Sequence, residues 1–141
     1  ARFLTAIYGE GHVDPDGVTL RLACAGHPRP VLLHADGSVE QVGECGDLLG
    51  VFDGPQIPVT RLRLAPGEAL VCFTDGVTER RSGTRMLGED GVLTALHGAS
   101  GLTAPSLARR LGAVVRDFAP EPARDDVAVL VLRATPDVGA R

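Results

Sequence analysis

The sequence predicts an α+β fold in which mostly antiparallel strands fill the first two thirds of the chain and helices follow. Up to residue 73, short apolar runs alternate with Gly, Pro and Asp, as is typical of strands joined by tight turns. From residue 88 the apolar residues recur with helical spacing instead. The 141 residues suit one domain with its own hydrophobic core.

Turn-forming residues arrange the first strands as three predicted hairpins. In each, two apolar runs flank a short turn: residues 2–8 and 18–24 flank DPDG, residues 31–34 and 38–42 flank ADG, and residues 57–64 and 68–73 flank APG. Residues 69–73 have no polar face, which predicts a strand covered on both sides.

Two helices and a last strand are predicted in the remainder. The segment GEDGVLTALHG, from residue 88, predicts a short helix interrupted near its start by Gly91. Thr103 can cap a longer helix over residues 104–118, whose apolar side chains form one stripe: Leu107, Leu111, Val114, Val115 and Phe118. Residues 127–133 are apolar on both faces, which predicts a central strand, and residues 134–141 predict a loose tail.

Composition and charge exclude several classes of function. The net charge of −4 and the scattered arginines argue against a nucleic-acid partner. The sequence has no apolar run long enough to cross a membrane and no leader pattern, so no membrane partner is expected. Cys24, Cys45 and Cys72 lack disulfide or zinc spacing, which favours a reducing cytoplasm. Cys24 and Cys72, in apolar strands, are interpreted as small core residues.

Two groups of carboxylates flank the most apolar strands. Asp75 follows residues 69–73, and Asp125 and Asp126 precede residues 127–133. If these strands are antiparallel neighbours, both groups lie at one sheet edge, where a hard cation such as Mg²⁺ or Mn²⁺ would relieve their repulsion. Successive strand residues point to opposite faces, so one of Asp125 and Asp126 is expected to reach the site. Taken singly, each group is also typical of a turn or of a charge flanking an apolar strand.

Six segments carry a resemblance to a known family. They are FLTAIYG, LACAGHPRPVLL, GDLLGV, LAPGEALVCFTDGVTE, LGEDGVL and DDVAVLVLR. In this order they resemble the C-terminal part of SpoIIE/RsbU-type phosphatases, which are metal-dependent (PPM, type 2C) serine/threonine protein phosphatases. The resemblance spans residues 2–133. It implies an α-β-β-α sandwich with two Mn²⁺ or Mg²⁺ ions at one edge of the paired sheets.

The resemblance also implies roles for individual residues. Asp75 of TDG and Asp125, the first Asp of DDV, are the implied metal ligands, with Gly76, Asp126 and His27 as support around them. A water activated by the two ions would attack phosphorus, so no side chain acts as nucleophile. The family's GD-x-x-G-x-G loop, whose Asp bridges the ions, has no counterpart in this sequence, and Leu48 stands where Pro is common.

Two further groups of residues have open interpretations. His27, between Gly26 and Pro28, either faces the metal edge as a proton carrier or is structural. Three arginines either guide a phosphorylated partner or belong to a solvated loop: Arg80, Arg81 and Arg85. The other histidines are not spaced like metal ligands: His12, His34 and His97.

The leading hypothesis is that residues 1–133 are the C-terminal part of a bacterial serine/threonine phosphatase domain. Its expected substrate is a phosphorylated regulatory protein of the anti-anti-sigma-factor type. Because an incomplete sandwich exposes strand edges, which favour pairing with another chain, a homodimer is among the expected partners. One alternative is a non-catalytic phosphatase-like module that binds a signalling partner. A third hypothesis is an unrelated β-rich binding domain, whose properties would not change when metal is added.

Overall fold

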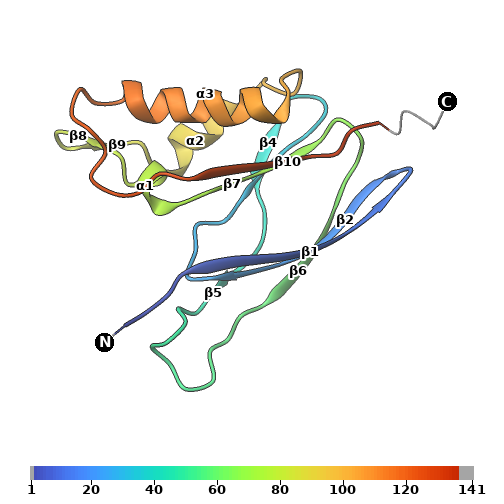
Figure 1. Cartoon of the computed structure of the whole chain (residues 1–141), viewed down its shortest axis with the longest axis horizontal. Coiled ribbons are helices and arrows are strands. Elements are labelled where there is room, and N and C mark those ends of the chain that lie inside the picture. Colours follow the sequence, from blue (N-terminus) through green and yellow to red (C-terminus); the bar gives the residue numbers. More distant parts are fainter. Residues whose placement is uncertain (1, 137–141) are drawn as a thin grey trace.

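Two β-sheets stacked face to face, with helices on one outer side, make up residues 2–136, which the computed structural model describes (Figure 1). The predicted α+β class, with largely antiparallel sheets, is confirmed. Within the described residues the helices cover one face of the stack, so these residues supply an α-β-β part of the expected α-β-β-α sandwich (Figure 1).

The first sheet contains the predicted hairpin around DPDG. Its strands are β1 (Ala6–Asp14), β2 (Gly17–Ala25), β5 (Cys45–Gly46) and β6 (Val59–Leu64), and β2 pairs with the other three. Its first strand lies later than the predicted residues 2–8, and the hairpin closes at the pair Asp14 and Gly17. Gly17 has φ of 136°, and a Cβ there would lie 2.1 Å from the Leu64 carbonyl oxygen, so the turn requires glycine.

The second sheet holds the most deeply buried strand. Its order is β10-β7-β3-β4, formed by β10 (Val129–Arg133), β7 (Ala69–Phe73), β3 (Val31–Leu33) and β4 (Val39–Gln41). The predicted hairpin around ADG is confirmed, since β3 and β4 pair antiparallel. The prediction that residues 69–73 are covered on both faces is also confirmed, because helices lie on one side of β7 and the first sheet on the other (Figure 1).

The predicted hairpin around APG is wrong. β6 pairs with β2 in the first sheet, whereas β7 pairs with β3 and β10 in the second. Leu64 of β6 and Leu70 of β7 instead meet in the core between the sheets, so the two strands face each other rather than pairing side by side. A turn sequence shows that the chain reverses direction. It does not show whether the two strands pair within one sheet or pack face to face in different sheets.

The prediction of a central last strand is also wrong for the described residues, in which β10 lies at a sheet edge. Val129 and Val131 pack against the helical side, but Leu130 and Leu132, on the opposite face, are 70% and 41% exposed. Within residues 2–136, one apolar face of β10 is therefore buried and the other is exposed. Ala134, assigned to the tail, is buried and continues the pairing with Glu68, while residues 137–141 of that tail lie outside the described residues.

The helices match the predictions except at Gly91. α3 (Ala104–Asp117) begins where expected, because the Thr103 hydroxyl accepts a hydrogen bond from the Ser106 amide at 3.3 Å. α2 (Gly88–Leu96) runs without interruption through Gly91, where a Cβ would lie 2.5 Å from the Leu87 side chain. Gly91 thus makes room for packing rather than breaking the helix. No helix in residues 2–136 is both long and apolar enough to span a membrane.

Four short elements were not predicted. They are the strand β5, a single helical turn, α1 (Asp75–Thr78), and the two strands of a small hairpin, β8 (Arg81–Ser82) and β9 (Arg85–Met86). Two cores stabilise the whole. One lies between α2, α3 and the second sheet, and includes the predicted stripe residues Leu107, Leu111 and Val115. The other fills the space between the sheets.

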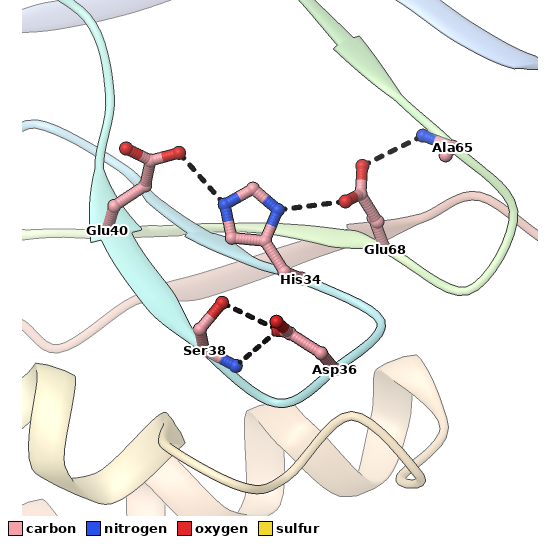
Figure 2. A network of polar contacts seen from close by, with 6 residues as sticks. All are labelled: His34, Asp36, Ser38, Glu40, Ala65 and Glu68. Atoms are coloured by element: carbon pink, nitrogen blue, oxygen red, sulfur yellow. Dashed lines mark hydrogen bonds and ion pairs between the residues drawn. The ribbon is translucent and has the colours of Figure 1, made fainter.

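A polar network fixes the end of the second sheet that is remote from Asp75 (Figure 2). His34, after β3, contacts Glu68 through Nδ1 and Glu40 through Nε2, each at 2.8 Å. Glu68 also accepts the Ala65 amide at 2.9 Å. The hydrogen bonds to Glu68 and then Glu40 raise the pKa of His34. The ring contacts the two carboxylates from opposite sides, so they do not converge on one metal position.

This network predicts a pH-dependent contribution to stability. Because the pKa of folded His34 is raised above 6.5, the contribution is fully present below the pKa of the unfolded chain and disappears as the pH rises through the folded value. We therefore expect His34→Gln to lower the melting temperature more at about pH 5.5 than at about pH 8.5. Glu40→Gln, which removes one charge, should reduce this difference. An equal loss at both pH values would contradict the assignment.

Candidate functional site

Strand pairing brings the two groups of carboxylates to one edge of the second sheet. β7 and β10 are antiparallel, with Phe73 opposite Val129, so Asp75 just after β7 lies at the same end as Asp125 and Asp126 before β10. The sequence predicted that the two groups share an edge if their strands are antiparallel neighbours, and the strands do pair in this way. All three carboxylate residues are exposed. In the described residues none of them is held in an ion pair, which leaves their oxygen atoms available to a ligand.

Thr74 and Gly76 tie the two halves of this edge together. The Thr74 hydroxyl donates to the Asp126 carbonyl and accepts from the Ala128 amide, both at 3.0 Å. A Cβ at Gly76 would lie 2.3 Å from the Asp126 carbonyl oxygen. Only glycine therefore allows the segment that carries Asp125 to approach α1 so closely. This observation gives a physical reason for the supporting position predicted for Gly76.

Arg80 fixes the segment between α3 and Asp125 from the other side. Its side chain is 8% exposed, and its Nε donates to the Val115 carbonyl at 2.9 Å. Its Nη2 donates to the carbonyls of Ala119, at 3.0 Å, and Glu121. These contacts satisfy carbonyl groups at and beyond the last turn of α3, which have no helical partner. Arg80 is thus neither in a solvated loop nor fully available to a partner, in contrast to both interpretations of the sequence.

A pocket of about 460 Å³ opens beside this edge. It lies where α1, the β8–β9 hairpin and the connection from α3 to β10 meet at one end of the molecule (Figure 1). Its lining is strongly charged: three arginines (Arg80, Arg81 and Arg124) and three carboxylates (Glu79, Glu121 and Asp125). Gly76 and Gly83 contribute backbone without side chains.

The other predicted residues lie in less direct positions. The His27 ring is half-buried, and its Nδ1 contacts the Pro28 carbonyl at 2.9 Å, a structural contact. Arg85 stacks 5.5 Å from the centre of the Phe118 ring instead of lining the pocket. Burial raises the pKa of the Cys72 thiol to about 11 and raises that of Cys24 as well, which fits two core residues rather than nucleophiles.

The available donors fit a hard cation only in part. Asp75 and Asp125 offer exposed carboxylate oxygens at one edge, the ligand type that Mg²⁺ and Mn²⁺ prefer. Among residues 2–136, however, no three His, Cys, Asp or Glu side chains gather as a metal-binding cluster. A site formed by these residues alone would therefore bind such ions weakly, because affinity rises with the number of charged ligands.

Sequence reasoning missed Thr74, Arg124 and the structural role of Arg80. One signal for Arg80 was present: α3 is followed by APEPA, without a glycine C-cap, so its last carbonyl groups needed side-chain donors. Arg124 stands next to Asp125, and this adjacency was the only indication that it shares the site. Nothing in the sequence pattern separated Thr74 from an ordinary strand end.

The two-sheet architecture is shared with solved PP2C phosphatase domains. The family model described as Stage II sporulation protein E (SpoIIE) matches residues 1–135. The chain belongs to the SpoIIE family.

Three solved structures illustrate the similarity. The RsbU and RsbW domains of Rv1364c from Mycobacterium tuberculosis are 28% identical with a TM-score of 0.68, over 89% of this chain and 35% of that one. The SpoIIE phosphatase domain from Bacillus subtilis, presoaked with Mn, is 17% identical with a TM-score of 0.69, over 96% and 60%. The catalytic domain of the serine/threonine phosphatase PstP, in complex with two manganese ions, is 19% identical with a TM-score of 0.59, over 94% and 58%. The chain thus spans 60% or less of each of these proteins.

Proposed function

We propose that this chain is the C-terminal part of a metal-dependent serine/threonine protein phosphatase domain, as expected from the sequence. The observation that carries the proposal is the meeting of Asp75 and Asp125 at one sheet edge, held there by Thr74, Gly76 and Arg80. Membership of the SpoIIE family supports it, as does the fold shared with a phosphatase that binds two manganese ions.

In this proposal the chain's own residues bind and orient. Asp75 and Asp125 hold divalent cations through their carboxylates, while Gly76 and Thr74 keep the two aspartates at a fixed separation. Asp126 contributes through its backbone carbonyl, and its side chain is exposed beside the site. Mn²⁺ or Mg²⁺, when bound, would activate water and neutralise negative charge on the phosphoryl group.

The proposed substrate is a phosphoserine or phosphothreonine residue on a regulatory protein of the anti-anti-sigma-factor type. One relative joins RsbU and RsbW domains in a single protein, which supports a regulatory partner for this chain. A cytoplasmic location and a homodimer formed through open strand edges remain predictions.

Metal dependence and completeness of the domain test this function together. This chain matches 60% of the SpoIIE phosphatase domain. A completed domain, in which the remaining part of such a domain is joined to this chain, should hydrolyse a phosphoserine protein only with Mn²⁺ or Mg²⁺. The 141-residue chain alone should be nearly inactive at millimolar Mn²⁺, because its carboxylates form only part of a site. Turnover of a phosphoserine protein, measured with and without chelator, decides between these outcomes.

Two results would count against the proposal. Activity that resists chelation would exclude a metal-dependent reaction. Tight binding of a phosphoprotein by the completed domain without any turnover would favour the alternative of a non-catalytic module. Full activity of the chain alone would instead show that other residues here complete the site, with Asp126, Glu79 and His27 the first to replace.

A further inference from the structure

The charged pocket beside Asp125 contains an arginine whose side chain is held in place before any ligand arrives. Arg80 is buried, and two of its three guanidinium nitrogens, Nε and Nη2, donate to backbone carbonyls. The third nitrogen, Nη1, has no hydrogen-bond partner among residues 2–136, although Arg80 lines the pocket. Nη1 is not among the fully enclosed polar atoms that lack a partner, so it is accessible to solvent. A guanidinium fixed in this way binds an anion with little loss of side-chain entropy.

Two further arginines line the same pocket. Arg81 lies on β8 and Arg124 stands directly before Asp125, and both are exposed. Together with Arg80 they place guanidinium groups from two separate segments of the chain around one cavity. Guanidinium groups bind phosphate oxygens through paired, charge-assisted hydrogen bonds, which makes a phosphate group the best-matched ligand.

The carboxylates in the pocket do not cancel this attraction. Glu79 and Glu121 are exposed, as are Arg81 and Arg124, so water and salt screen these two negative and two positive charges alike. The charge of buried Arg80 is screened much less, because it is largely removed from solvent. The remaining carboxylate, Asp125, is also exposed, so its charge is screened even when no cation is bound to it.

We propose that this pocket binds the phosphate group of the phosphoprotein substrate, with Arg80, Arg81 and Arg124 as its cationic contacts. The inference rests on the proposed function, because it places the substrate's phosphate next to Asp125. Unlike the proposed turnover, phosphate binding by this pocket should not require a divalent cation, because the arginines bind the phosphate directly.

Phosphate titration of the full chain tests the pocket directly. In chelator and at constant ionic strength, inorganic phosphate should cause saturable nuclear magnetic resonance shifts at residues 76–83 and 121–125. Arg81→Gln and Arg124→Gln should each weaken phosphate binding about threefold to tenfold, as expected for partly screened charge pairs. Glu121→Gln should strengthen binding, because it removes a repulsive charge and keeps the backbone carbonyl that Arg80 binds. Arg61→Gln, at an exposed position of β6, is the matched control and should have no effect.

The same variants in the completed domain give a second measurement, inhibition of turnover by inorganic phosphate. Arg81→Gln and Arg124→Gln should raise the inhibition constant by the same factors. Absence of saturable shifts, or equal effects of Arg61→Gln and Arg81→Gln, would overturn the pocket. If metal-dependent turnover persists while phosphate binding is absent, only the pocket is wrong. If phosphate binds but the completed domain never turns over substrate, the proposed function is wrong and the pocket stands.

Discussion

Replacing Asp75 or Asp125 by Asn is expected to lower turnover of the completed domain by about a hundredfold or more while leaving the fold intact. Each change removes a negative charge that the proposed cations require, and even the loss of a group that only orients a metal ligand typically lowers activity or affinity 10–100-fold. Both side chains are exposed and neither takes part in an ion pair within residues 2–136, so stability should change little. The measurements are kcat at saturating Mn²⁺ and the melting temperature.

Two controls make this result specific. Asp53→Asn, at an exposed position outside the site, should leave kcat unchanged. Asp126→Asn should have a smaller effect than Asp125→Asn, because the structural contact of Asp126 is made by its backbone carbonyl. If Asp126→Asn is the more damaging change, the choice between the adjacent aspartates is wrong.

Replacing Arg80 by Met is expected to lower the free energy of unfolding by about 3 kcal/mol or more. The substitution leaves the carbonyls of Val115, Ala119 and Glu121 without their donor, and hydrogen bonds to charged groups contribute about 1.5–3 kcal/mol each in favourable cases. Urea unfolding of the chain measures this loss. The backbone order parameters of residues 119–126 should also fall, because within residues 2–136 Arg80 and Thr74 are the side chains that donate hydrogen bonds to the carbonyls of that segment.

Arg110 provides a matched comparison for Arg80. Its Nε also donates to a helix carbonyl, that of Ala95, but it makes this single bond from a largely exposed position. Arg110→Met should therefore destabilise by about 1 kcal/mol and leave the backbone order parameters of residues 119–126 unaffected. Equal destabilisation by the two substitutions would show that Arg80 has no special structural role.

Local sequence patterns predicted most of the elements but not how they assemble. Turn residues and apolar spacing located the hairpins around DPDG and ADG, and Thr103 marked the start of α3. The same kind of signal failed at APG, because strands that face each other across a core and strands that pair share one alternating pattern. For β10, an apolar pattern on both faces predicted burial that residues 2–136 provide on one face only.

The candidate site shows the same division between local and long-range information. Asp75 and the pair Asp125 and Asp126 were predicted because charges at the ends of apolar strands are conspicuous, and the family resemblance then favoured Asp125. The pairing of β7 with β10 places both groups at one edge. Arg80 and Thr74 were not identifiable, because each acts on backbone carbonyls distant in sequence. Every residue has a backbone carbonyl, so the sequence does not show which carbonyl groups accept these hydrogen bonds. Such contacts can be identified only in the folded chain.

The strand order also determines when the acidic edge can exist during synthesis. The chain crosses repeatedly between the sheets, yet every strand of the first sheet has been made by Leu64, whereas the second sheet must wait for β10. Asp75 therefore leaves the ribosome long before its partner strand does. Until β10 pairs with β7, Thr74 and Gly76 do not contact the segment that carries Asp125 and Asp126. The nascent chain then carries the Asp75 carboxylate without the other two at the same edge. A ribosome that stops before β10 leaves a product that has all the first-sheet strands described here but no acidic edge.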